Sequence, residues 1–438
     1  MIIAASVQLA RPLVIEIIRS VIDAGKEELG TDFDQISYVS LRGQVISGID
    51  RFARKKISRV INGTGILMHT NLGRAPLSEI LFDKVKEHTT GYGNLEFDVN
   101  SGRRGQRGEM AEKYLALASD AESGTIVNNN AAALFLILNT LANRKTVLIS
   151  RGEMIQIGGG FRIPDIIRKS GARLVEVGTS NITTVSDYEN GLSENPALIL
   201  KVHRSNFAIT GFTEEVGLKA LVDLGRKNSV PVINDLGSGV LIDTTEFAGL
   251  REPSVQNSVH DGAALTCFSG DKLLGGVQAG MLVGETDLVR AIKKNPIYRT
   301  MRVDKITFSV IEELLGYYLD DSWKENIKLW RLASVSESEL YQKGQTLLKE
   351  IGGGGKVSLE GCKAEMGGGA LPGVQLPSVA LVFKGGLSPQ RIAALFREAV
   401  PPVIGRVTDD RFMIDLKALD ENDSAALATI IKELIDKI

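Results

Sequence analysis

The sequence predicts an α/β fold built on a mainly parallel sheet. From Thr125 onward, short apolar runs of strand length alternate with helical patterns. This alternation is typical of proteins in which helices cover both faces of a parallel sheet. The run 230–235 ends in Asp235 and the run 125–127 is followed by three asparagines, and ligands of such sheets gather at the carboxyl ends of the strands. We therefore expect a covered sheet with a ligand site at one edge.

Five apolar runs have the length and composition of strands, and three helical patterns lie among them. The strands are expected at 125–127, 146–149, 173–177, 197–202 and 230–235, and the helices at 131–141, 163–169 and 216–227. A sixth apolar run, 263–268, leads to Lys272, and a helix is expected beyond Gly280 to about Lys294.

Three domains are expected, at 1–58, 59–310 and 311–438. Helical spacing at 13–29 and 39–59 predicts a short helical N-terminal domain. Its second helix ends in a basic cluster, which fits either RNA phosphates or a solvated helix face: Arg51, Arg54, Lys55, Lys56 and Arg59. The C-terminal part predicts a small α/β domain, with strands at 378–383, 403–407 and 412–416 and helices at 388–399 and 423–437.

Composition excludes a dedicated nucleic-acid binder with a global basic field. The 438 residues carry a net charge of -2, so any RNA contact is local. The two cysteines, Cys267 and Cys362, have no metal-like spacing, which favours a reduced compartment and no metal site. The chain starts without a basic region before its first apolar residues, and no run reaches membrane-spanning length. We expect a cytoplasmic protein with no membrane contact.

Lys272 is a candidate for covalent catalysis. The apolar run 263–268 delivers this single lysine into a Ser-Gly-Asp turn, and Gly275 and Gly276 follow. A lysine held above a rigid strand and partly desolvated forms Schiff bases with carbonyl groups, which points to pyridoxal phosphate (PLP). The alternative is an ordinary surface lysine in a turn.

Two other stretches support a PLP site. Asp235 ends a strand 37 residues before Lys272, where a carboxylate holds the pyridine nitrogen of the cofactor protonated; the alternative is a turn-initiating Asp. Asn130 and Ala131 lie where a strand, a turn of three asparagines and a helix meet. This is the pattern of a phosphate site, and the alternative is an N-capped core helix.

Further candidates lie near the same strand ends. Asn206 is placed to bond the ring hydroxyl oxygen of PLP, with His203 as a weaker candidate, and Ser269 to bond the phosphate. Met154 and Gln156 are guesses for the residue that stacks on the ring.

Three arginines form a candidate anion clamp. Arg74 lies on a turn, and Arg299 and Arg302 share a face if a helix begins there. The alternative for Arg74 is an arginine that packs its stem on a loop. The loop 91–108 contributes Arg103, Arg104 and Arg107, which suit an anion or a subunit contact.

Six motifs together resemble one family. They are NLGRA (71–75), SGRRG (101–105), NNNAAA (128–133), SRGE (150–153), FRIPD (161–165) and SGDKLLGG (269–276). In this order they resemble bacterial selenocysteine synthase, the L-seryl-tRNA(Sec) selenium transferase, from about Val60 to Arg406 or beyond.

The resemblance implies a PLP-dependent transferase of fold type I with a seven-stranded type of sheet. It implies that Lys272 carries the internal aldimine, that Asp235 holds the pyridinium, and that Arg74, Arg299 and Arg302 bind selenophosphate. The implied reaction converts seryl-tRNA(Sec) to selenocysteinyl-tRNA(Sec) through a dehydroalanyl intermediate. The implied partners are tRNA(Sec) and further copies of the chain, as a dimer or a ring of dimers. The tRNA-binding N-terminal domain is shortened here, since Met1 to Arg11 replaces a further helical stretch.

Two other functions remain open from the sequence. One is a PLP-dependent lyase acting on a small free or phosphorylated amino acid, in which Arg406 binds a substrate carboxylate. The other is a catalytically silent RNA-binding or scaffold relative. Intact Lys272 and Asp235 argue against the silent relative, since such a protein needs neither.

Overall fold

The computed structural model describes residues 9–29, 38–207, 209–249, 251–352 and 355–438 and divides into two compact units between Val60 and Ile61. In the first unit, α2 (Arg11–Leu29) and α3 (Tyr38–Ala53) pack through Val14, Ile17, Val45 and Ile49. The second helix is shorter than expected: it ends at Ala53, and most of the basic cluster lies beyond its end. Repulsion between closely spaced like charges opposes its continuation.

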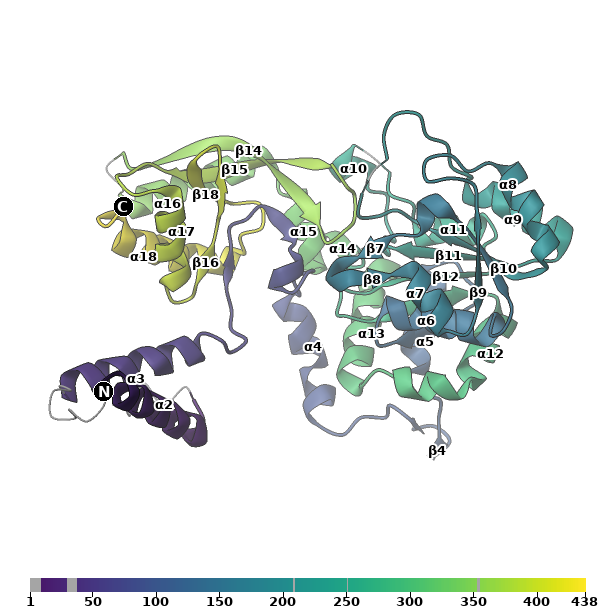
Figure 1. Ribbon diagram of the computed structural model, residues 1–438, viewed down its shortest axis with the longest axis horizontal. Coiled ribbons are helices and arrows are strands. Elements are labelled where there is room, and N and C mark those ends of the chain that lie inside the picture. The colour runs from purple at the N-terminus through teal and green to yellow at the C-terminus, as the bar shows by residue number, and fades with distance from the viewer. Residues whose placement is uncertain (1–8, 30–37, 208, 250, 353–354) are drawn as a thin grey trace. The chain divides into compact units, whose positions relative to one another are not determined.

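A seven-stranded sheet organises the second unit (Figure 1). The strand order is β5 (Ser123–Val127), β13 (Gly280–Gly284), β12 (Leu265–Ser269), β11 (Val232–Gly237), β10 (Pro196–Val202), β6 (Thr146–Ser150) and β9 (Arg173–Val177). Six strands are parallel to one another, and β13 is antiparallel to both neighbours. The predicted fold class, a mainly parallel sheet of seven strands, is confirmed.

The strand β13 corrects one expectation. The sequence predicts a helix beyond Gly280, but 280–284 is a buried strand and α12 (Thr286–Lys294) begins after it. Short apolar runs do not separate buried strands from buried helices by periodicity, so its five residues, GMLVG, carry little signal.

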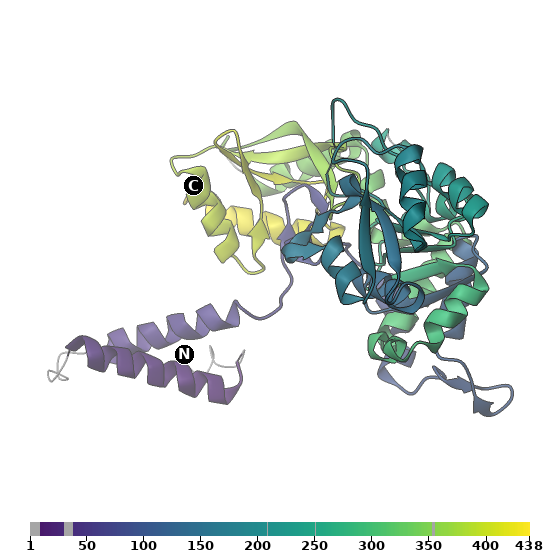
Figure 2. The ribbon, with the colours of Figure 1, turned by 45° about the vertical axis from the view of Figure 1, so that its right-hand side comes forward.

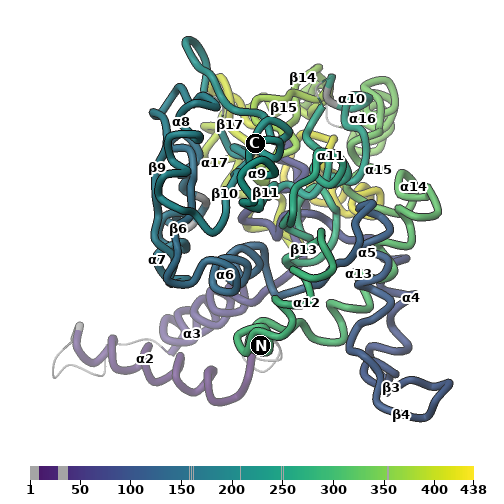
Figure 3. Tube along the Cα trace, turned by 90° about the vertical axis from the view of Figure 1, so that its right-hand side faces the viewer, coloured from purple at the N-terminus to yellow at the C-terminus, as the bar shows by residue number. Residues whose placement is uncertain are grey.

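Alternate strand residues enter cores on the two faces of the sheet. Val147 and Ile149 pack with α6 (Asn130–Leu141), α7 (Ile163–Lys169) and α12, whereas Leu148 packs with α8 (Val185–Gly191) and α9 (Leu218–Asn228). Farther along the second face, α5 (Glu109–Ala118), α11 (Val255–His260) and α13 (Lys305–Leu319) pack in the largest core. Figures 2 and 3 show these helices flanking the sheet from two further directions. The central strands of the sheet are almost entirely buried, whereas the edge strand β9 is partly exposed, and the buried strands give the site a rigid base.

A five-stranded sheet forms the C-terminal part of the second unit. Its order is β17 (Arg406–Thr408), β18 (Arg411–Asp415), β15 (Gln375–Phe383), β14 (Val357–Gly367) and β2 (Ile66–Met68). The helices α16 (Glu337–Ile351), α17 (Pro389–Glu398) and α18 (Ser424–Ile435) share its apolar core. The predicted strand 403–407 is two short strands, β16 (Val403–Ile404) and β17, because the first pairs with β1 (Ile61–Asn62) and the second pairs with β18.

The expected division at residue 310 stays a prediction. Within the described ranges, no helix has both the length and the apolar content needed to cross a membrane.

Candidate active site

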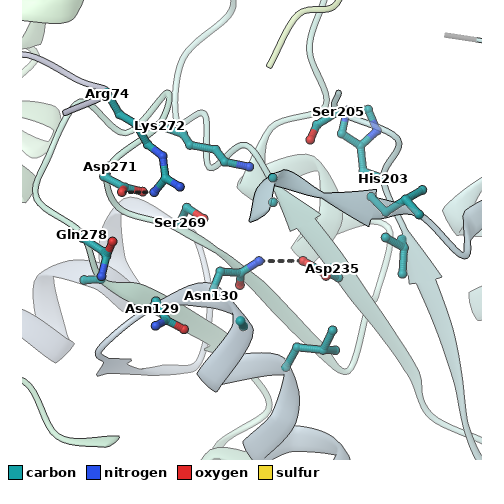
Figure 4. A pocket seen from close by; sticks show the side chains of 17 residues that line it. Arg74, Asn129, Asn130, His203, Ser205, Asp235, Ser269, Asp271, Lys272 and Gln278 are labelled. Carbon is teal, nitrogen blue, oxygen red and sulfur yellow. Dashed lines mark hydrogen bonds and ion pairs between the residues drawn. The ribbon is translucent and has the colours of Figure 1, made fainter. Parts of the chain in front are cut away.

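A cavity of about 220 Å³ lies at the carboxyl ends of β10, β11 and β12. Six of the residues predicted for the site line it: Arg74, Asn130, Ala131, Asp235, Ser269 and Lys272. Figure 4 labels five of these side chains, all but Ala131, and shows them converging from the start of α6, from the strand ends and from the Arg74 loop. Residues far apart in the sequence are thus brought to one place.

Lys272 is held in a tight turn after β12 and is only 9% exposed. Its carbonyl accepts a hydrogen bond of 2.8 Å from the N–H of Gly275, whose φ of 76° suits glycine. Burial lowers the pKa of the Lys272 amine, and Asp235 and Asp271 oppose this shift. At a given pH a larger fraction of the Lys272 amine is therefore neutral, and so nucleophilic, than in an exposed lysine. The alternative of a surface turn lysine is excluded by this burial.

Asp235 faces the same cavity from β11 and is 4% exposed. Its Oδ1 accepts a hydrogen bond of 2.8 Å from Asn130 Nδ2 and a longer contact of 3.7 Å from Cys267 Sγ. Burial raises the pKa of the Asp235 carboxyl, while Asn130, Lys272 and Cys267 lower it. A buried carboxylate at this place suits a protonated ring nitrogen of PLP as its partner, while the nearby Lys272 amine suits the aldehyde group of the cofactor.

The three asparagines at the start of α6 have separate roles. The N–H of Asn128 donates to the carbonyl of Met301 (3.0 Å), Asn129 Oδ1 caps α6 by accepting from the N–H of Ala132 (2.8 Å), and Asn130 bonds Asp235. The capping alternative is therefore right for Asn129 alone. Ala131 places a small side chain at the helix N-terminus beside the cavity, where an anion is favoured.

Arg74 approaches the cavity in a left-handed backbone conformation, with φ of 66°. Its N–H donates to the carbonyl of His69 (3.0 Å), and its guanidinium forms an ion pair with Asp271. Asp271 was not predicted, although it stands next to Lys272 in the sequence. The pair keeps a cation at the rim of the cavity.

The comparisons decide the family. Residues 60–420 match the family model described as SelA: L-seryl-tRNA selenium transferase. The chain belongs to this family. It is 45% identical over 392 residues to the L-seryl-tRNA(Sec) selenium transferase of Aquifex aeolicus, covering 88% of this chain and 86% of that protein. The protein of the same name from Geobacter sulfurreducens is 40% identical over 434 residues, covering 97% and 94%. The predicted family and enzyme class are confirmed.

The fold of this chain is similar to that of a solved structure. D-glucosaminate-6-phosphate ammonia-lyase matches with a TM-score of 0.61 and 18% identity, covering 87% of this chain and 96% of that one. At this identity the likeness concerns the fold alone, and it agrees with fold type I.

The cavity residues of this SelA family member fit PLP. Besides the buried amine and carboxylate, Asn130 Oδ1 is buried with no partner among the described residues, so a polar acceptor faces the cavity. PLP is the cofactor that this residue set and the family support. Among the described residues, no group of three or more His, Cys, Asp or Glu side chains is arranged to hold a metal ion.

Other predicted residues lie outside the cavity. Arg299, on η6 (Pro296–Met301), and Arg302 are exposed and do not line it. Asn206 also lies outside, and its Nδ2 donates to the carbonyl of Gln156 (3.1 Å). One chain alone therefore does not bring three arginines together around this cavity. The roles assigned to Arg299, Arg302 and Asn206 stay predictions.

Several lining residues were missed or ranked low. His203 lines the cavity, with Nε2 3.1 Å from the buried Glu252 carboxylate, and Ser205 and Gln278 line it as well. The guesses for the stacking residue, Met154 and Gln156, do not line the cavity, whereas their neighbour Ile155 does. Ser205 could have been predicted from its position just after the end of a strand. The sequence holds no comparable signal for Gln278.

Proposed function

We propose that this chain transfers selenium from selenophosphate to the seryl group of seryl-tRNA(Sec), with PLP as cofactor. The observation that carries the proposal is the meeting of Lys272, Asp235 and the start of α6 in one cavity of a SelA family member. In the reaction the β-carbon of serine loses its C–O bond as water and gains a C–Se bond from selenophosphate, and one water then breaks the Se–P bond so that phosphate leaves.

Lys272 would hold the cofactor covalently, Asp235 would hold its ring nitrogen protonated, and the start of α6 would hold its phosphate. The bound cofactor supplies an electron sink for the α-carbon of the seryl group. Lys272 Nζ, with its lowered pKa, is the group in the cavity suited to take the α-proton. Asn130 keeps the Asp235 carboxylate in place through the 2.8 Å hydrogen bond.

Arg74, Arg299 and Arg302 would bind the selenophosphate dianion, because guanidinium groups suit multiply charged oxyanions. Only Arg74 lines the cavity of its own chain. We propose a homo-oligomer, either a dimer or a ring of dimers, in which the two other arginines serve a cavity completed by a second copy. Asn206 would reach the ring hydroxyl in that assembly.

The N-terminal domain, 1–58, would bind tRNA(Sec) in the cytoplasm. Its support is the basic cluster after α3, because Lys and Arg neutralise phosphates. A test is the binding of the protein to seryl-tRNA(Sec) and seryl-tRNA(Ser) at stated salt. Clear preference for the first is expected, and equal binding would contradict selective recognition.

Arg406 argues against the small-molecule lyase. Its guanidinium pairs with the buried Asp415 at 3.0 Å and donates to the carbonyl of Lys363 at 2.9 Å, and it does not line the cavity. An arginine so engaged is not available for a substrate carboxylate, and a seryl ester has none to offer.

Lys272→Ala tests the proposal. The variant should lose the visible absorbance of lysine-bound PLP and the incorporation of selenium into seryl-tRNA(Sec), while Lys227→Ala, an exposed position on α9, should change neither. Turnover retained by Lys272→Ala would contradict the assignment.

A further inference from the structure

A buried polar network underlies the segment that carries Arg299 and Arg302. Its centre is Glu112 of α5, which is 6% exposed. Glu112 Oε1 accepts a hydrogen bond of 2.6 Å from Thr125 Oγ1, and Oε2 accepts bonds from Lys293 Nζ (2.6 Å) and Gln106 Nε2 (2.9 Å). The carboxylate therefore accepts hydrogen bonds from β5, from α12 and from the loop before α5.

Tyr298 of η6 joins this network in a defined direction. Its hydroxyl lies 2.8 Å from Thr125 Oγ1 and 3.5 Å from Glu112 Oε1. A hydroxyl has one proton, and that of Thr125 is given to Glu112, so Tyr298 is the donor to Thr125. Burial raises the pKa of the Tyr298 hydroxyl to about 12, so it keeps its proton at neutral pH. Tyr298 is therefore joined to Glu112 through Thr125 and by a longer direct contact.

The arginine-bearing segment is also fastened at both ends. Asn295 Nδ2 donates to Asn139 and Thr140 of α6 at 3.0 and 2.9 Å. Beyond Tyr298, the carbonyl of Met301 accepts from Asn128 at 3.0 Å, and the carbonyl of Val303 accepts from Arg107 at 2.8 Å. Nine residues thus have anchors at their start, middle and end.

These anchors face inward, and the arginines face outward. In a 3-10 helix, residues three apart lie on one side. Tyr298 and Met301 pack against the core, while Arg299 and Arg302 are exposed and make no hydrogen bond or ion pair with a described side chain. Short 3-10 segments have poor internal hydrogen-bond geometry. The network, rather than the segment itself, therefore fixes the backbone positions from which the side chains of Arg299 and Arg302 extend.

We propose that the chain Tyr298–Thr125–Glu112 positions Arg299 and Arg302 for the selenium donor. The inference rests on the proposed function, in which these arginines bind selenophosphate, and it adds three positioning residues that do not touch the donor. The network reaches the start of α6 of the same chain through the Asn128–Met301 bond, so it ties the arginine-bearing segment to that helix.

The test compares steady-state kinetics of Tyr298→Phe, Thr125→Val and Thr125→Ser in the full protein loaded with PLP. Tyr298→Phe and Thr125→Val should raise the KM for selenophosphate about fivefold, the effect of losing one buried hydrogen bond. The KM for seryl-tRNA(Sec) and the cofactor absorbance should stay unchanged. Thr125→Ser keeps the hydroxyl and should restore the donor KM. Tyr188→Phe, which alters a buried tyrosine of α8, serves as the matched control and should leave both KM values unchanged.

Arg299→Ala separates failure of this inference from failure of the proposed function. It should raise the donor KM about tenfold or more, as expected for a charge-assisted contact. If it does so while Tyr298→Phe and Thr125→Val do not, the positioning role is wrong and the donor site stands. If Tyr298→Phe weakens both substrates equally or releases PLP, the network only supports the fold and the inference is wrong. If Arg299→Ala leaves the donor KM unchanged, the donor site itself is wrong and the inference falls with it.

Discussion

Asn130 Nδ2 donates a hydrogen bond of 2.8 Å to Asp235 Oδ1, from the first turn of α6 to the end of β11. The start of α6 is the expected phosphate end of the cofactor site, and Asp235 is the expected ring-nitrogen end. One side chain therefore fixes the two ends of the site relative to each other. It also keeps a donor on a carboxylate whose pKa is raised by burial.

Asn130→Ala should weaken PLP binding by about tenfold, the effect of removing a hydrogen bond from a buried charge. Without this donor the pKa of Asp235 rises further, so a larger fraction of the carboxyl is protonated at any given pH. Binding should then be lost at a higher pH as the solution is acidified. Titration of the cofactor absorbance across pH measures both effects. Asn128→Ala is the control, because the side chain of Asn128 is exposed; equal behaviour of the two variants would contradict the role of Asn130.

Gly280→Ala should destabilise the fold at the cofactor site. A Cβ at this position would lie 2.1 Å from the carbonyl oxygen of Asn129 and 2.9 Å from the backbone nitrogen of Asn130. Both contacts are with backbone, so β13 or the start of α6 must move, at about 2 kcal/mol or more. Thermal unfolding with and without PLP measures the loss. At Gly386 no heavy atom lies within 4 Å of an added Cβ, and Gly386→Ala should melt like the wild type. Wild-type stability and PLP affinity of Gly280→Ala would show that the contact relaxes freely.

The sequence predicted the parts of the site that single segments encode. Lys272, Asp235 and Asn130 each follow or end a strand pattern, and their common position at the sheet edge follows from parallel topology. Pairings between distant segments were not predictable: Arg74 meets Asp271 because the 69–75 loop reaches the turn after β12. The strand β13 was missed for a local reason, since its five residues have no distinguishing period. Arg299 and Arg302 lie outside the cavity of their own chain. No sequence pattern indicates whether a side chain contributes to the site of its own chain or to that of another copy.

Lys272→Met should stabilise the protein in the absence of PLP. Burial lowers the pKa of Lys272 below the value of 10.5 for an ordinary lysine. Between the two pKa values the unfolded chain binds more protons than the folded chain, so the free energy of unfolding rises with pH across that interval. Below the interval, the buried charged amine destabilises the folded state in full. The variant should therefore melt at a higher temperature near neutral pH, and its advantage should shrink as the pH approaches 10.5.

Differential scanning calorimetry over a pH series measures this effect. Lys227→Met, at the exposed position on α9, should show no such pH-dependent gain. An advantage of Lys272→Met that stays constant up to pH values around 10.5 would mean that apolar packing, and not the amine, is responsible.

Arg406→Ala should lower stability without changing the affinity for seryl-tRNA(Sec). Asp415 is fully buried and accepts from Arg406 (3.0 Å), Ser378 (2.5 Å), Cys362 (3.2 Å) and the N–H of Lys417 (3.0 Å). Removing the guanidinium leaves this carboxylate without its cation, at a cost of roughly 3 kcal/mol. Since Arg406 does not line the cavity, the KM for seryl-tRNA(Sec) should stay at the wild-type value once the variant is kept well below its melting temperature.

The same variant separates the two enzyme functions. In a lyase whose substrate carboxylate is bound by Arg406, Arg406→Ala would reduce kcat/KM by about a hundredfold, the effect of losing a bidentate charged contact, and Arg406→Lys would recover little of it. In the selenium transferase, Arg406→Lys keeps a cation beside Asp415 and should recover much of the stability while kcat/KM is unaffected throughout. Denaturant unfolding and kinetics on the same three proteins therefore report whether this arginine serves Asp415 or a substrate.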